Sequence, residues 1–210
     1  MIISVIFVLL FLAFLMGIIL VPKIDGKINM IKVAVMGIMA IFCYQSFWAF
    51  MFQLVGIPVN LKSTCISMAA AVLLLWGMII KKKKMQRIFV RITDIAVLAV
   101  LAGIVIAVSL HMFTPYLRLS YINSDPANHF NDAMVIVKQG VLGKHIYFSA
   151  FVNAMFIEIF SPILIVSKYY KAFIFADIFM HVLEVWMCYV LMLTVSEKKI
   201  VRIFAPVFAL

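Results

Sequence analysis

Residues 92–113 read ITDIAVLAVLAGIVIAVSLHMF, and this continuous apolar stretch decides the fold class. A helix needs about 20 consecutive apolar residues to cross the roughly 30 Å hydrocarbon core of a bilayer. The strands of a membrane β-barrel alternate apolar and polar residues instead, about ten at a time. In lipid, backbone groups must be paired within a helix or a closed barrel. We therefore expect residues 92–113 to form a transmembrane α-helix.

The composition extends this expectation to the whole chain. Of the 210 residues, 67% are hydrophobic, whereas soluble domains average about 45–50%. The net charge is +10, from 18 Lys and Arg against 8 Asp and Glu. These basic residues lie between apolar runs, where they fix orientation and meet anionic lipid, so we expect no nucleic-acid partner. The fold class predicted is an all-α, polytopic transmembrane bundle.

The pattern predicts spanning helices at 1–21, 30–52, 65–80, 92–113 and 172–195. The first run has neither a basic start nor a small-residue cleavage site, so it is expected to be a retained helix and not a signal peptide. A last apolar run, 203–210, is too short to span. It resembles the start of another helix, and we therefore expect further C-terminal helices or a partner subunit.

Three basic clusters predict the topology, because loops rich in Lys and Arg stay in the cytoplasm. The clusters are Lys81 to Lys84 with Arg87 and Arg91, then Lys198 with Lys199 and Arg202, and finally Lys23 with Lys27 and Lys32. An outside N-terminus places all three inside and residues 114–171 outside. This holds only if the apolar segment 146–166 does not cross. We expect that segment to be a juxtamembrane or re-entrant helix.

The external loop carries the first group of polar side chains. A short amphipathic helix is predicted over 126–139, with an N-cap at Ser124 or Asp125 and an end at Gly140. Asp125, His129 and Asp132 fall on one face of this helix. Asp125 is interpreted either as a helix cap or as a carboxylate that acts as a base or metal ligand.

A second group lies within the last predicted span. Asp177, His181 and Glu184 recur at the same helical spacing. Ionisable groups inside a bilayer are costly and usually face a partner or a wet cavity. We leave open whether they form a structural network or a path for a substrate or proton.

The stretch Ser124-Asp125-Pro126-Ala127-Asn128-His129-Phe130 resembles the first external loop of GT-C membrane glycosyltransferases. In that family an acidic residue follows an outward helix, juxtamembrane helices come next, and a second helix returns inward. Residues 92–210 follow this order, whereas the three helices of residues 1–91 precede it and depart from the family pattern. Most of the family's core would lie beyond Leu210.

The resemblance implies transfer of a sugar from a polyprenyl-phosphate donor on the outer face of a plasma membrane, with a bacterial cell envelope favoured by the composition. It implies Asp125 as the catalytic carboxylate, with a divalent cation as a possible cofactor. The substrate-binding residues expected are His129, Asp132, Lys144, His145 and Glu158. Arg118 and Lys138 are further candidates for contact with the donor phosphate.

Two other functions fit the sequence. One is a cell-envelope polysaccharide polymerase or ligase. The other is a non-catalytic, transporter-like membrane subunit that uses Asp177, His181 and Glu184. An enzyme needs an external acid in a cavity, whereas a transporter needs embedded acids that face a water path.

Overall fold

The computed structural model describes residues 2–21, 27–81, 87–113, 125–142, 148–196 and 198–209. These residues form an all-α bundle, as predicted. The α-helices are α1 (Ile2–Leu20), α2 (Met30–Leu54), α3 (Leu61–Lys81), α4 (Ile92–Phe113), α5 (Asp125–Gln139), α6 (Phe148–Phe160), α7 (Tyr169–Val195) and α8 (Lys199–Phe204). Two short 3-10 helices, η1 (Val166–Lys168) and η2 (Ala205–Ala209), and two strands, β1 (Lys27–Asn29) and β2 (Arg87–Phe89), complete the elements.

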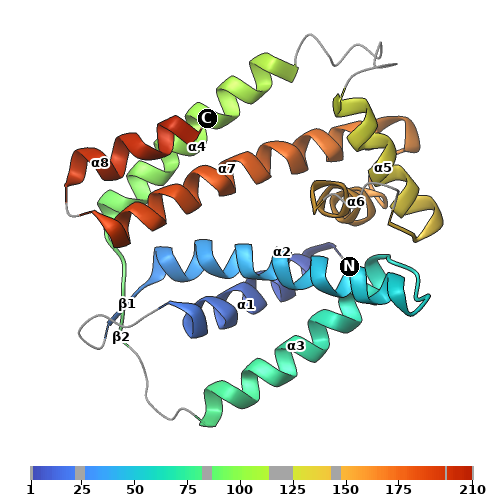
Figure 1. Cartoon of the computed structure of the whole chain (residues 1–210), viewed down its shortest axis with the longest axis horizontal. Coiled ribbons are helices and arrows are strands. Elements are labelled where there is room, and N and C mark those ends of the chain that lie inside the picture. The colour runs from blue at the N-terminus through green and yellow to red at the C-terminus, as the bar shows by residue number, and fades with distance from the viewer. Residues whose placement is uncertain are drawn as a thin grey trace.

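The long helices are stacked around α2 and α7 (Figure 1). α2 packs against α1 and α3 on one side and against α7 on the other, and α7 packs against α4. The indole Nε1 of Trp186 on α7 donates a hydrogen bond of 3.0 Å to the backbone oxygen of Leu98 on α4.

Four of the predicted spans are confirmed by length and composition. They are α2, α3, α4 and α7. α3 begins at Leu61, before the predicted residue 65, because Asn60 caps it: Asn60 Oδ1 accepts hydrogen bonds from the backbone N–H groups of Lys62 and Ser63 at 3.0 and 3.1 Å. α1 has 19 residues and is therefore about 28 Å long. That length is close to the bilayer core, and the crossing of α1 stays a prediction.

α1 and α2 approach each other through two glycines. A Cβ atom on Gly17 would lie 2.0 Å from the backbone oxygen of Val33, and one on Gly37 would lie 1.9 Å from that of Ala13. Small residues let membrane helices come this close, which increases the dispersion contacts between them. The pair of glycines therefore fixes how α1 crosses α2.

α5 and α6 lie across one end of the bundle. Figure 1 looks almost along α6 while α2 and α7 run across the view, so α6 is steeply inclined to both. α6 has 13 residues and is about 20 Å long, too short to cross a core of roughly 30 Å. The length supports the prediction that segment 146–166 does not span.

The opposite end holds the described residues of the three basic clusters. There β1 pairs in parallel with β2, and Lys27 lies opposite Arg87. The strands precede α2 and α4, and the end of α7 and α8 lie at the same end of the bundle (Figure 1). The described parts of the three basic clusters are thus gathered at one end, as the predicted topology requires. The side of the membrane on which this end lies stays a prediction.

Cysteine labelling tests that orientation. We expect Lys138→Cys on α5 to react with a membrane-impermeant maleimide in intact cells and Lys198→Cys to be protected, because both side chains are exposed but lie at opposite ends of the bundle. The background lacks the native cysteines Cys43, Cys65 and Cys188. Permeabilised cells, in which both positions should react, provide the control. Labelling of Lys198→Cys in intact cells would show that the orientation is the reverse of the predicted one.

Candidate functional site

The predicted amphipathic helix is present as α5, and it covers the end of the bundle. Its apolar face buries Ala133 and Ile136. The ring of Phe130 meets that of Phe173 on α7 edge-on, with centroids 5.5 Å apart. Gly140 ends the helix with a φ of 66°, a left-handed conformation that favours glycine. α5 is therefore packed into the fold, and one face remains accessible.

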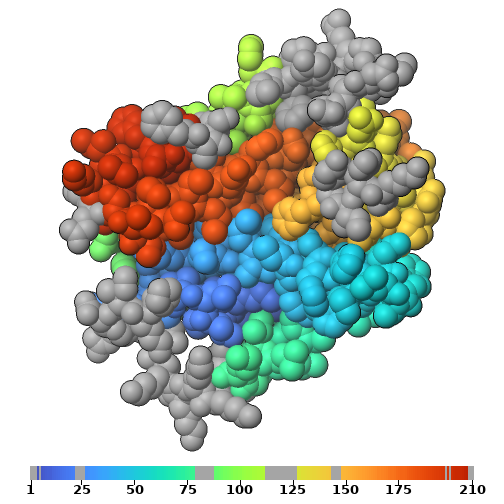
Figure 2. Space-filling model, viewed as in Figure 1, coloured from blue at the N-terminus to red at the C-terminus, as the bar shows by residue number. Residues whose placement is uncertain are grey.

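The connection between α2 and α3 supports α5 from the other side. The backbone N–H of Val59 donates to the Gly140 oxygen at 2.7 Å. The N–H of Leu142 donates to Oε1 of Gln53 at 3.0 Å. In Figure 2, α5 and the end of α2 cover the same end of the molecule. The N-terminal helices thus hold the candidate site in place.

The two groups of polar residues predicted separately meet at this end. Asp177 interacts electrostatically with His181 on its own helix and with His129 on α5. The Asp177 Oδ2 to His181 Nδ1 distance is 3.9 Å. Asp177 is half-buried, whereas His181 is more exposed. The α5–α7 junction therefore places one carboxylate within electrostatic range of two imidazoles, and groups of these types can bind and transfer protons.

The structure describes only some of the other predicted site residues. Asp125 is the first residue of α5, one residue before the predicted start at 126, and its side chain lies outside the described residues. Lys144, His145 and Arg118 lie outside them as well. Asp132 is half-buried on α5. Their parts in a substrate site stay predictions.

A metal site is not assembled by the described side chains. Among them, no three His, Cys, Asp or Glu residues lie close enough together to hold an ion. The divalent cation stays a prediction.

Glu158 has a structural contact at the start of α3. The half-buried carboxylate Oε2 accepts a hydrogen bond from the backbone N–H of Leu61, the first residue of α3. A negative charge at a helix N-terminus is favoured by the helix dipole. Burial nevertheless raises the pKa of Glu158 above its ordinary value of 4.5, and the Leu61 hydrogen bond opposes part of that rise. A further role of Glu158 in substrate binding stays a prediction.

The raised pKa of Glu158 predicts a pH dependence of stability. Below pH 4.5 the side chain is neutral in both the folded and the unfolded protein. As the pH rises through the higher folded-state pKa, the unfolded carboxyl loses its proton more readily, so the free energy of unfolding falls. We expect Glu158→Gln, which keeps an acceptor for Leu61, to weaken this fall and to raise the melting temperature at pH about 7.

Thermal unfolding in detergent micelles between pH about 4 and 8 measures this difference. Asp132→Asn removes a carboxylate from α5, which lies outside the candidate spanning helices, and serves as the control. Equal pH profiles for Glu158→Gln and the wild type would show that burial of Glu158 does not affect stability.

His181 and Glu184 lie on an exposed face of α7, with Glu184 near the middle of the helix. Neither residue lines the cavity inside the bundle, whose described walls are almost wholly apolar. Among the described residues, these side chains therefore form no polar path through the bundle. Since an ionisable group at this depth is costly in lipid, this face is expected to need a partner.

A polar cluster at the opposite end was missed by the sequence analysis. The buried carboxylate of Asp94 accepts hydrogen bonds from Tyr189 Oη at 3.0 Å and from Asn29 Nδ2 at 3.4 Å. Lys32 Nζ donates to Thr194 Oγ1 at 3.0 Å. These bonds tie the starts of α2 and α4 to the end of α7. An Asp in the first turn of a span was the available signal, because such a position suits the helix dipole.

Relatives provide no further guide to the function of this end of the bundle. Comparisons with protein-family models, with curated proteins and with solved structures found no match to this chain.

Proposed function

We propose that the protein acts as a GT-C-like membrane glycosyltransferase that uses a lipid-linked sugar donor at the α5–α6 end. The observation that carries the proposal is the junction of α5 with α7, where His129 lies within electrostatic range of Asp177 on the helix that begins at Asp125. The order of α4, two transverse helices and α7 supports it as well. In the predicted topology, the end that holds these groups would lie at the outer headgroups, where a lipid-borne phosphate is presented.

The reaction needs a base and a site for a phosphate. In the proposed step, Asp125 takes the proton of an acceptor hydroxyl, and the acceptor oxygen forms a bond to the anomeric carbon of the sugar. The bond from that carbon to the phosphate oxygen breaks, and the polyprenyl phosphate leaves with the electron pair. The proposed phosphate ligands are Lys144 and His145, with a divalent cation as a further source of positive charge. His129 and Asp132 are proposed to contact the sugar or the acceptor.

The alternatives differ in product. A polysaccharide polymerase or ligase would extend or transfer a chain of sugars, whereas the proposed enzyme adds a single sugar. A transporter would move a solute without breaking a glycosidic bond. The exposed position of His181 and Glu184 does not favour the transporter. We propose the plasma membrane as the location, because a lipid-linked donor and an external acceptor meet there.

An assay of the complete protein tests the proposal. The protein is reconstituted into vesicles with a radiolabelled polyprenyl-phosphate sugar and a crude cell-envelope fraction as acceptor. The expected result is transfer of label from the lipid to an acceptor, one sugar at a time. Transfer of a labelled polymer would favour the polymerase, and retention of all label on the lipid would contradict the proposed function.

A further inference from the structure

A cavity of about 320 Å³ lies inside the bundle, enclosed by α1, α2, α3, α6 and α7. Ile38 and Ile41 of α2 line one wall, and Val152 and Met155 of α6 line another. The volume is about twice that of an engineered apolar cavity known to bind benzene. The space is therefore large enough for part of a hydrocarbon chain.

The walls of the cavity are made of carbon and sulfur. Two polar residues lie at its margin: Thr64 Oγ1 lies 3.3 Å from Met155 Sδ, and Gln45 Oε1 accepts from Ser67 Oγ at 2.7 Å, whereas the buried Nε2 of Gln45 has no partner among the described residues. A water molecule needs two to four polar partners to remain in a buried site. The Nε2 group of Gln45 supplies fewer polar partners than that, so water is a poor occupant of this cavity.

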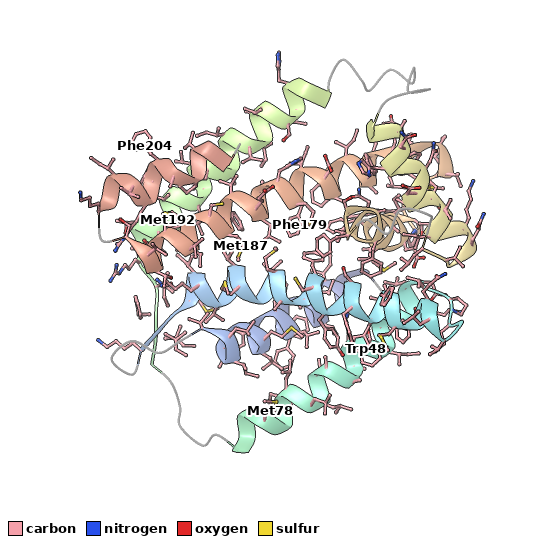
Figure 3. All side chains as sticks on the ribbon, viewed as in Figure 1. Trp48, Met78, Phe179, Met187, Met192 and Phe204 are labelled. Atoms are coloured by element: carbon pink, nitrogen blue, oxygen red, sulfur yellow. The ribbon has the colours of Figure 1, made fainter. Side chains whose placement is uncertain are left out.

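Aromatic rings keep the cavity from collapsing. The ring of Phe156 on α6 lies 5.8 Å from that of Phe175 and 5.6 Å from that of Phe179, both on α7. Phe179 also lies 6.0 Å from Phe42 of α2, and Figure 3 shows it between α7 and α2, beside α6. These contacts brace α6 against the two long helices and hold the walls apart.

The mouth of the cavity faces the lipid. Three of its lining residues, Ile6 and Leu10 on α1 and Phe175 on α7, are 40%, 57% and 53% exposed. Ile6 lies near the start of α1 and Phe175 near the start of α7, so the mouth is on the α5–α6 side of the bundle. In a membrane, this part of a spanning bundle is surrounded by hydrocarbon.

We infer that the cavity binds one acyl chain of a glycerophospholipid from the leaflet on the α5–α6 side. An empty space of this size leaves its lining atoms without dispersion partners. Acyl chains are the molecules present at the mouth, and they match the walls chemically. The chain enters between α1 and α7 and contacts α6, so the lipid supports the helix that lies across the end of the bundle. This inference does not rest on the proposed function.

A photoactivatable phospholipid tests the site. The complete protein is reconstituted into phosphatidylglycerol and phosphatidylethanolamine vesicles that contain a small fraction of a phospholipid with a diazirine in its acyl chain. After irradiation, we expect cross-links on the buried residues Val152 and Met155 of α6. Leu10→Trp places an indole in the mouth and should lower these cross-links to background.

The matched control is Leu73→Trp, since Leu73 is 75% exposed on α3 and does not line the cavity. It should leave the cross-links on Val152 and Met155 unchanged. Circular dichroism and gel filtration check that both variants fold, and Ile6→Trp provides a second block of the mouth. Cross-links on α6 that persist in both mouth variants, or wild-type cross-links confined to lipid-facing residues such as Leu73, would overturn the inference.

Discussion

Asp125→Asn in the complete protein is expected to lower the rate of sugar transfer by about 10²- to 10⁴-fold, the usual effect of losing a general base. Asn caps a helix about as well as Asp and has nearly the same volume, so folding and membrane insertion should survive. What the substitution removes is the negative charge, and with it the capacity to accept a proton or bind a cation. Initial rates of label transfer in the vesicle assay measure the effect.

Asp132→Asn is the matched control, because Asp132 lies on the same helix and predicted face but is not the proposed base. It is expected to cost less activity than Asp125→Asn. Asp125→Ala is less informative, since it removes the cap and the charge together. If Asp125→Asn keeps a near-normal rate, Asp125 is a cap alone, and the proposed chemistry loses its base.

Gly37→Leu is expected to destabilise the protein by more than about 3 kcal/mol, beyond the usual cost of overpacking a core. Even the first added carbon would lie 1.9 Å from the backbone oxygen of Ala13, and backbone cannot move aside as a flexible side chain can. α1 must therefore separate from α2. Because α1 also lines the lipid cavity, the variant should lose the α6 cross-links as well.

Gly103→Leu is the control for this substitution. A Cβ atom on Gly103, in α4, meets nothing within 4 Å, so the same change of residue adds a side chain toward open space. It should leave stability unchanged or raise it by up to about 1 kcal/mol, since glycine is a poor helix former. Thermal unfolding and the yield of monodisperse protein in mild detergent compare the two variants. Equal yields and melting temperatures would mean that α1 and α2 do not pack this closely.

Much of the fold could be predicted from the sequence, because lipid imposes simple rules on it. The length of the apolar segments predicted α2, α3, α4 and α7. The need to keep all three basic clusters on the cytoplasmic side, together with the polar residues of segment 146–166, predicted that this segment does not span. The amphipathic pattern and Gly140 predicted α5 closely. The early start of α3 could also have been found, since Asn60 followed by Ser63 is a capping signal.

The contacts between distant segments could not be predicted in the same way. His129 and Asp177 were each recognised on a helix face, but only tertiary packing of α5 on α7 brings them together. The apolar cavity has no signature in the sequence either, because its lining residues look like ordinary lipid-facing or core residues. The β1–β2 pair was missed since each strand has three residues, too few for an alternating pattern.

The pairing of β1 with β2 also sets an order of events during synthesis. Lys27 of β1 pairs with Arg87 of β2, which is synthesised later, because α2 and α3 lie between them in the chain. At about 5–20 residues per second, the ribosome needs roughly 3–12 s to make the intervening segment. The strand before α2 is therefore complete, but without its partner strand, while two helices are inserted. The pair can close only after the α2–α3 hairpin has returned the chain to the side from which it entered, so failure of either α2 or α3 to cross would leave β1 and β2 on opposite faces of the membrane.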